Sequence, residues 1–457
     1  MGHNLIFYGD IIINSDTKRI FAIALPLILQ QIFLQLQIYV DRAFLGHVNF
    51  EFFSAIGNVL VPYYAIISVI TAICTGTTIL IAHSIGAKND EMSKKYAEVS
   101  FLGSTVISLA MFLFFFFGSG IIFKIMGVQS PILEYSTSYL KILSFSLLIF
   151  GIYTTSVSIM QGVGLTKIIM ITGIVSNTLN IMLDYILIFG KFGFSQMGIE
   201  GAALASVVSI TAAVPIITVY VFKSKNMPFK VNFFDVVYSK LYLYKEVLKK
   251  GLPTGLEIGL WNIGSVIIIA LLNRLDSFSV GVYTLIFSIQ LVPLFFYTGL
   301  AQATLTLVGF KTGEGEHKQA VNIGFKATLF SMMICVVFSV LFVLFPKNIM
   351  GIFTDNVPFI ETGAKYFFIV AMTMFPKALN IIMGHGIRGM GDTKWMMYTQ
   401  IFGTIFVITL SYCLIFIAKL GLMGVFITYL ADETIRGLIN MFRFWLGRKF
   451  YRLKPLP

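Results

Sequence analysis

Long apolar stretches, separated by short polar segments, run through the chain from end to end. A helix needs about 20 apolar residues to cross the hydrocarbon core of a bilayer, and the sequence contains twelve stretches of that kind. They lie near residues 20–41, 57–84, 98–123, 135–161, 168–190, 199–222, 251–273, 280–310, 321–346, 362–387, 395–418 and 421–445. The pattern therefore predicts an all-α polytopic membrane protein with twelve transmembrane helices.

One connection between the predicted spans is much longer than the others. It covers residues 223–250, carries seven lysines and follows the sixth span. We therefore predict an N-lobe of six spans in residues 1–222, a basic cytoplasmic linker in residues 223–250, and a C-lobe of six spans in residues 251–457. The C-lobe ends in a short cytoplasmic tail.

The composition agrees with a membrane protein and excludes several other classes. Of the 457 residues, 57% are hydrophobic and only 12% are charged, whereas a soluble domain has about 25% charged residues. This balance excludes a disordered chain and argues against an ordinary soluble enzyme.

The positions of the cations account for the net charge of +12 without a nucleic-acid partner. With the N-terminus inside, 22 of the 33 Lys and Arg residues fall in inner segments and 6 in outer segments. Cytoplasmic loops of membrane proteins carry such an excess. We therefore expect a multi-pass protein of the cell's inner (cytoplasmic) membrane, surrounded by the lipid bilayer, with both termini in the cytoplasm.

The two halves of the chain match each other at a constant shift of 227 residues. Six spans in each half, both starting inside, give parallel repeats, which are one of the two repeat types of secondary transporters. Two similar lobes can then expose a site to either side of the membrane in turn. A duplicated scaffold with a different function is the alternative. The matching pairs are Pro26 and Pro253, Gly86 and Gly313, Pro131 and Pro358, Gly162 and Gly389, and Lys167 and Lys394.

Two acidic residues fall within the first and fifth spans, where an ionisable side chain is costly and points to a function. Both spans run from inside to outside, so Asp41 and Asp184 lie in the outer half of the N-lobe. Asn180 lies one turn before Asp184 and shares its helix face. Two carboxylates and an amide could hold a small cation such as Na+ or share a proton. An interfacial place beside Arg42 is the alternative for Asp41.

Prolines occupy equivalent positions near the start of the first and seventh spans. A proline inside a helix removes a hydrogen bond and bends the helix. Pro26 is therefore a candidate hinge, and a static bend used for packing is the alternative, above all for Pro253.

The C-lobe offers weaker polar candidates, which are Glu257, Lys377 and His385. Glu257 lies either at the inner rim of the lobe or in a solvated helix start. Arg388 lies near the end of the tenth span, and we expect its long side chain to extend to the membrane interface.

Five segments resemble the multidrug and toxic compound extrusion (MATE) family, and the resemblance covers residues 18–445. This resemblance implies a V-shaped exporter of twelve helices, with no cofactor and no enzymatic activity. It exchanges Na+ or H+ for small amphipathic, often cationic organic compounds, and we expect a monomer. The family's ion site maps onto Asp41, Asn180 and Asp184, and its bending first helix carries a proline at Pro26. The segments are ALPLILQQIFLQLQIYVDRAFLGHV, IAHSIGAKN, QGVGLTK, NTLNIMLDYILIFG and GIEGAALAS.

Three departures from the family pattern bear on the branch. A threonine that joins the ion site in some members corresponds to Ala202 here. The acid that other members carry on the seventh helix corresponds to Trp261, and the tenth helix has Lys377 and His385 where an acid would be expected. We therefore predict a DinF-like member in which coupling takes place in the N-lobe.

Two other functions remain as alternatives. A flippase for lipid-linked precursors, from the same superfamily, often has extra helices and a strongly basic cavity, whereas this sequence predicts twelve spans and few buried cations. A membrane-embedded prenyl transferase needs paired Asp-rich motifs for Mg2+ and diphosphate. Asn177, Asn180 and Asp184 resemble one such motif faintly, and the spans contain no second one.

Overall fold

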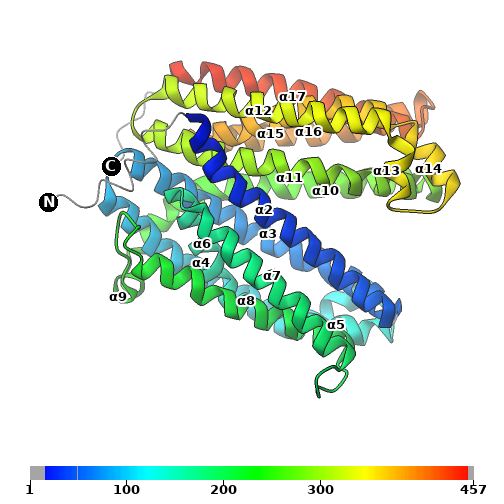
Figure 1. Ribbon diagram of the computed structural model, residues 1–457, viewed down its shortest axis with the longest axis horizontal. Helices are drawn as coiled ribbons and strands as arrows, with labels where there is room; N and C mark the ends of the chain where they lie inside the picture. The colour runs from blue at the N-terminus through cyan, green and yellow to red at the C-terminus, as the bar shows by residue number, and fades with distance from the viewer. Residues whose placement is uncertain (1–15, 49, 451–457) are drawn as a thin grey trace. The chain divides into compact units, whose positions relative to one another are not determined.

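The computed structural model of the chain describes residues 16–48 and 50–450, and these residues fold into helices joined by short connections (Figure 1). Ten helices are long and apolar enough to cross a membrane, and an eleventh span results if one bent helix pair counts as a single span. The prediction of an all-α polytopic membrane protein is confirmed.

The described helices divide into two compact units. The first unit comprises residues 29–255, and its core lies between α3, α5 and α8. Its elements are most of α2 (Asp16–Val48), α3 (Phe50–Gly86), α4 (Asp90–Ile125), α5 (Ile132–Ser144), α6 (Leu147–Val163), α7 (Thr166–Phe189), α8 (Gly198–Lys223), α9 (Phe233–Val237) and η1 (Leu241–Leu243).

The second unit comprises residues 16–28 and 256–450 of the described chain. Its central helix is α15, which packs against α11, α12 and α17, and the short helices α13 and α14 lie together at one end of the unit (Figure 1). Its elements are most of α10 (Tyr244–Asn273), α11 (Ser277–Gly313), α12 (His317–Leu344), α13 (Pro346–Gly351), α14 (Val357–Ala364), α15 (Phe367–Gly389), α16 (Thr393–Tyr412), η2 (Cys413–Ile417) and α17 (Leu422–Phe450).

Each of the twelve predicted spans overlaps helix, and three of them differ from a simple apolar rod. The span at 362–387 begins in α14 and continues in α15, with a break at residues 365–366. The span at 135–161 is divided into α5 and α6, which meet at an angle of 52°. The span at 421–445 lies in α17. This helix is not among the ten apolar spans, because three charged residues, Asp432, Glu433 and Arg436, lie close together in it. All three of these side chains are buried.

The boundaries of the two units fall inside helices, and each lies two residues after a proline. The first boundary lies between Ile28 and Leu29, after Pro26, and the second lies between Gly255 and Leu256, after Pro253. The units therefore differ from the predicted lobes only over residues 16–28 and 223–255. The predicted C-terminal tail beyond residue 450 and the first fifteen residues lie outside the described part.

Small residues explain why the first part of α2 and the first part of α10 each pack in the unit formed mainly by the other repeat. Gly299 lies so close to α2 that an added Cβ would meet the side chain of Ile28, with the Ile28 nitrogen at 3.2 Å. At the equivalent place in the first unit, a Cβ on Gly255 would lie 3.3 Å from the Cβ of Ala72. Close approach of helix backbones through small residues is a common way to pack helices in membranes.

The predicted basic linker contains α9 and η1, and it packs against the start of α4. Lys94 donates a hydrogen bond of 2.7 Å to Asp235 Oδ2. This hydrogen bond lowers the pKa of the exposed Asp235 carboxyl. The segment therefore belongs to the packing of the first unit.

Gly76 provides a test of this packing, because a Cβ there would meet the backbone carbonyl oxygen of Val247 and lie 2.9 Å from the Gly251 nitrogen. Neither backbone atom can move away cheaply. We expect Gly76→Ala to destabilise the protein by about 1–3 kcal/mol, measured as a lower thermal unfolding temperature in detergent. Gly57, in the same helix, has no atom within 4 Å of its Cβ position. Gly57→Ala should leave the temperature equal or higher, and equal losses in both variants would contradict this packing.

Candidate functional site

The first unit brings the three residues of the predicted ion site together. Asn180 and Asp184 on α7 are buried, with 2% and 1% of their surface exposed, and Asp41 on α2 is partly buried. One terminal atom of the Asn180 amide lies 3.3 Å from Asp184 Oδ2 and 3.3 Å from Asp41 Oδ1. The two carboxyl groups are also close enough to share a hydrogen bond.

The Asn180 amide presents one terminal atom to the carboxyl groups and the other to Ser206. With its nitrogen toward the carboxyl groups, the Asn180 oxygen accepts a hydrogen bond of 3.2 Å from the Ser206 backbone N–H. With its oxygen toward them, that oxygen accepts a hydrogen bond of 2.5 Å from Gln37 Nε2, which also donates to Asp41 Oδ2 at 3.0 Å. The amide side chains of Asn180 and Gln37 therefore both face the carboxyl pair. The sequence analysis missed Gln37, although its position four residues before Asp41 was a usable signal.

Some polar atoms of this cluster have no partner in the part of the chain that the structure describes. They are Asp184 Oδ1 and Asn177 Nδ2, and both are fully buried. A buried acceptor without a partner costs about 1–3 kcal/mol. The cluster can therefore take up a proton or a small cation at Asp184.

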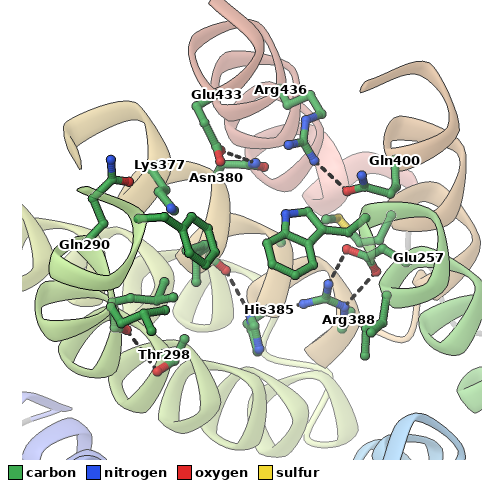
Figure 2. A pocket seen from close by; sticks show the side chains of 18 residues that line it. Glu257, Gln290, Thr298, Lys377, Asn380, His385, Arg388, Gln400, Glu433 and Arg436 are labelled. Carbon is green, nitrogen blue, oxygen red and sulfur yellow. Dashed lines mark hydrogen bonds and ion pairs between the residues drawn. The ribbon is translucent and has the colours of Figure 1, made fainter. Parts of the chain in front are cut away.

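The second unit contains a separate cavity of about 340 Å³, lined by both polar and apolar side chains (Figure 2). Side chains from α10, α11, α15, α16 and α17 converge on it. The three C-lobe residues that the sequence singled out, Glu257, Lys377 and His385, all line this cavity. The other polar residues that line it are Gln290, Thr298, Asn380, Arg388, Gln400, Glu433 and Arg436.

Arg388 and Glu257 form a buried ion pair across this cavity. Arg388 Nη2 donates to Glu257 Oε1 at 2.5 Å, and Nε donates to Oε2 at 3.3 Å. The expectation that Arg388 extends to the membrane interface is wrong, because a carboxylate on α10 neutralises its charge inside the unit. Glu257 is likewise buried and not part of a solvated helix start.

Arg436 and Asp432 form a second buried ion pair, within α17. Arg436 binds both carboxylate oxygens, at 2.6–3.0 Å. Its remaining donor, Nη1, binds Gln400 Oε1 at 2.8 Å. The sequence analysis did not consider Asp432 or Glu433, although three charges within five residues of an apolar stretch were a clear signal.

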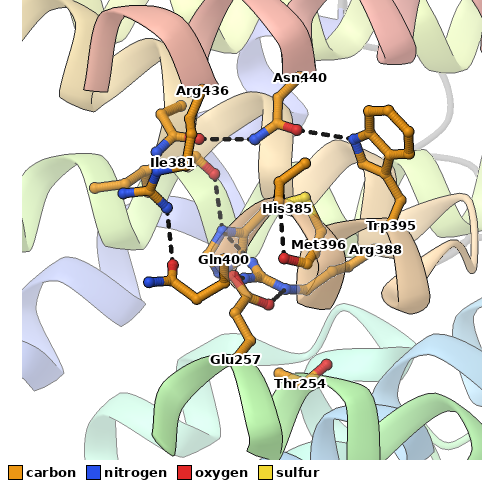
Figure 3. A network of polar contacts seen from close by, with 12 residues as sticks. Thr254, Glu257, Ile381, His385, Arg388, Trp395, Met396, Gln400, Arg436 and Asn440 are labelled. Carbon is orange, nitrogen blue, oxygen red and sulfur yellow. Dashed lines mark hydrogen bonds and ion pairs between the residues drawn. The ribbon is translucent and has the colours of Figure 1, made fainter. Parts of the chain in front are cut away.

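A chain of hydrogen bonds holds Glu433 in place. Asn380 donates to Glu433 Oε2 at 2.8 Å (Figure 2), and Asn440 donates to Asn380 Oδ1 at 2.8 Å. The Trp395 indole N–H in turn donates to Asn440 at 2.9 Å (Figure 3). Glu433 is therefore fixed at the cavity wall by a neutral amide.

His385 lies on α15 beside the Arg388–Glu257 pair. Its Nδ1 is 2.9 Å from the Ile381 carbonyl oxygen and 3.1 Å from Arg388 Nη1. Lys377, near the middle of α15, forms no hydrogen bond or ion pair with any residue in the described ranges. The structure thus places these two weak candidates in one site and gives them different surroundings.

Two repeats of apolar helices with charged groups buried inside them define a polytopic helical transporter. The family model described as MatE matches residues 26–186 and 253–413. The two matches begin and end 227 residues apart, which confirms the internal repeat. The chain belongs to the MatE family, the multidrug and toxic compound extrusion family of membrane transporters.

Curated relatives and solved structures agree with this assignment. A probable multidrug resistance protein NorM from Thermotoga maritima is 26% identical over 443 residues, which cover 94% of this chain and 92% of the relative. The uncharacterized transporter YisQ of Bacillus subtilis is 26% identical and covers 95% of both chains. The outward-facing structure of a multidrug resistance MATE family transporter has a TM-score of 0.90 at 20% identity, over 96% of this chain and 98% of that chain.

Removal of one partner from the Arg388–Glu257 pair should destabilise the fold. Glu257→Gln leaves a buried guanidinium without its carboxylate, at a cost of about 3–5 kcal/mol. We expect a clearly lower thermal unfolding temperature in detergent, and a partial recovery in the double variant Glu257→Gln/Arg388→Gln.

An exposed pair provides the control. Glu246 and Lys249 are 41% and 54% exposed, so Glu246→Gln should change the stability by less than about 1 kcal/mol. If the double variant loses as much stability as Glu257→Gln and Arg388→Gln lose when their separate losses are added, the charges of Arg388 and Glu257 are not coupled.

Proposed function

We propose that this protein is a secondary active multidrug exporter that exchanges a cation for amphipathic organic compounds by alternating access. The observation that carries the proposal is the buried carboxyl pair of Asp41 and Asp184, bridged by Asn180, in a member of a transporter family. Relatives named as probable multidrug resistance proteins support the substrate class. The protein acts as a transporter and not as an enzyme, and it needs no cofactor.

The coupling ion that fits the cluster best is a proton. Two carboxyl groups in contact in a low dielectric do not both remain charged at low cost, and Gln37 already donates a hydrogen bond to Asp41 Oδ2, one of the oxygens that a cation would need. Na+ is the second candidate, because Asp184 Oδ1 is buried and has no partner in the described part. Coupling requires that ion and drug favour different states of the protein.

Pro26 is proposed as the hinge that links the ion site to the transport step. It lies inside α2, two residues before that helix passes from the second unit to the first. Pro253 occupies the equivalent position in α10. A missing backbone hydrogen bond at each crossing lowers the cost of bending the helix there.

The remaining features follow from the sequence and the family. We propose a monomer in the cell's inner membrane, with both termini in the cytoplasm and no nucleic-acid partner. The DinF-like assignment is supported by the carboxyl cluster in the first unit. Glu257 and Glu433 line the cavity of the second unit, so carboxylates are present there as well.

A lipid-linked precursor flippase remains the second candidate function. Two cations, Arg388 and Arg436, are buried, and Lys377 lines the same cavity. Carboxylates neutralise both arginines. The cavity is therefore not strongly basic, and this neutralisation disfavours a polyanionic diphosphate. A prenyl transferase remains a remote alternative.

Replacement of either carboxyl group should abolish ion-driven export. We expect Asp41→Asn and Asp184→Asn each to reduce gradient-driven dye efflux from proteoliposomes at least tenfold, since neither variant can release and rebind the ion. Glu91→Gln, an exposed acid of the same unit that pairs with Lys95, should keep wild-type efflux. Full ion-driven efflux by Asp41→Asn would overturn the mechanism.

The coupling ion can be identified with two separate gradients. Efflux of a fluorescent cationic dye is measured in proteoliposomes under a pH gradient alone and then under a Na+ gradient alone. A proton-coupled cluster predicts efflux under the pH gradient only. Efflux under Na+ alone would make the cluster a sodium site, and no efflux under either gradient would favour the flippase.

A further inference from the structure

The cavity of the second unit contains two charged groups, Lys377 and Glu433, that form no direct ion pair, although their opposite charges attract each other at longer range and Glu433 is also attracted to Arg436. Of the charged side chains that line it, Arg388 and Arg436 are paired with carboxylates. Lys377 and Glu433 have no oppositely charged partner within 4.0 Å among the described residues. A charge inside a membrane protein is costly without a partner, so these two groups are the places where a ligand would gain most.

The two groups differ in what they can offer a ligand. The Lys377 ammonium has three N–H donors and no acceptor for any of them in the described ranges, near the middle of α15. Glu433 accepts one hydrogen bond at Oε2, from Asn380, which leaves Oε1 without a donor in the same part of the chain. Figure 2 shows both side chains at the wall of one cavity, on α15 and α17. The cavity therefore presents one cationic and one anionic contact point.

The rest of the wall is apolar and includes two aromatic rings. Trp261 on α10 and Phe287 on α11 line the cavity, with ring centroids 6.5 Å apart and planes inclined by 31°. Ligand sites typically combine such apolar surface with a few placed polar groups, in volumes of about 300–1,000 Å³. The cavity volume of about 340 Å³ suits a small flat ring system.

We propose that this cavity binds a zwitterion with an aromatic body, its carboxylate on Lys377, its ammonium on Glu433 and its ring against Trp261 and Phe287. The balance of charge selects this class. A purely cationic ligand leaves Lys377 without a partner, and a purely anionic ligand leaves Glu433 without one. A zwitterion satisfies both and adds no net charge to a low-dielectric site.

This proposal concerns a different unit from the ion site and does not depend on ion exchange at Asp41. It is therefore tested by equilibrium binding, with no gradient across a membrane. Glu91→Gln, at an exposed acid of the first unit, should bind the ligand as the wild type does. If no zwitterion binds, the export proposal is unaffected. If ion-driven export is not observed, the binding proposal is unaffected.

Three compounds that share an indole ring provide the test. They are L-tryptophan, a zwitterion, tryptamine, a cation, and indole-3-propionate, an anion. Binding of radiolabelled tryptophan to the purified full-length protein is measured directly, and the other two compounds are added as competitors. Each loses one charge-assisted hydrogen bond, so we expect each to bind at least tenfold more weakly than tryptophan. Tryptamine or indole-3-propionate binding as tightly as tryptophan, or no saturable binding of tryptophan, would overturn the proposal.

Charge-removing variants assign the contacts. Lys377→Met should weaken tryptophan and indole-3-propionate binding about tenfold or more and leave tryptamine binding unchanged. Glu433→Gln should weaken tryptophan and tryptamine binding and leave indole-3-propionate binding unchanged. Lys365→Met and Glu361→Gln, at exposed positions of the same unit, are the matched controls.

The variants are checked for folding by thermal unfolding without ligand. If Lys377→Met does not fold, Lys377→Arg keeps the charge and should retain the preference for tryptophan over tryptamine. The assigned contacts would be contradicted if both exposed control variants lost tryptophan binding. They would also be contradicted if Lys377→Met bound each of the three compounds as tightly as the wild type does. The selectivity of the wild-type protein decides the class of ligand without any variant.

Discussion

The absence of water from the bilayer interior is the constraint on which the whole structure depends. Backbone groups at that depth must bond within the chain, which restricts the spans to helices. Charged side chains must find partners inside the protein, and this second requirement organises α10, α15, α16 and α17. Arg388 meets Glu257, Arg436 meets Asp432, and Glu433 is held by an amide. Where a buried charged group lacks such a partner, we propose a binding site.

The internal repeat places a proline at equivalent points of the two helices that connect the units. Each repeat begins with a helix whose first part packs in the unit of the other repeat, so α2 and α10 connect the units at equivalent points. Close contacts through Gly299 and Gly255 hold those first parts in place. A proline lies just before each crossing. The helices are thus firmly packed on both sides of a weakened point, as a hinge requires.

The two units handle buried charge in different ways. In the first unit, two acids lie together and face the amide side chains of Gln37 and Asn180, which suits reversible uptake of one cation. In the cavity of the second unit, the two arginines are paired with acids, whereas Lys377 and Glu433 form no direct ion pair, which suits a ligand with two charges. An ion site and an organic-ligand site in separate units would let each bias the conformation independently.

The sequence by itself determined the spans, the repeat, the two prolines and the depth of Asp41 and Asp184. These features depend on local composition and on counting along a helix. Only the tertiary structure decided the environment of Arg388, because its partner Glu257 lies 131 positions away. The same holds for the link from Glu433 through Asn380 to Trp395, and for the approach of Asn180 to Asp41. Partners one helical turn apart, such as Asp432 and Arg436, can be read from local spacing, whereas partners on different helices are set by packing that no local pattern encodes.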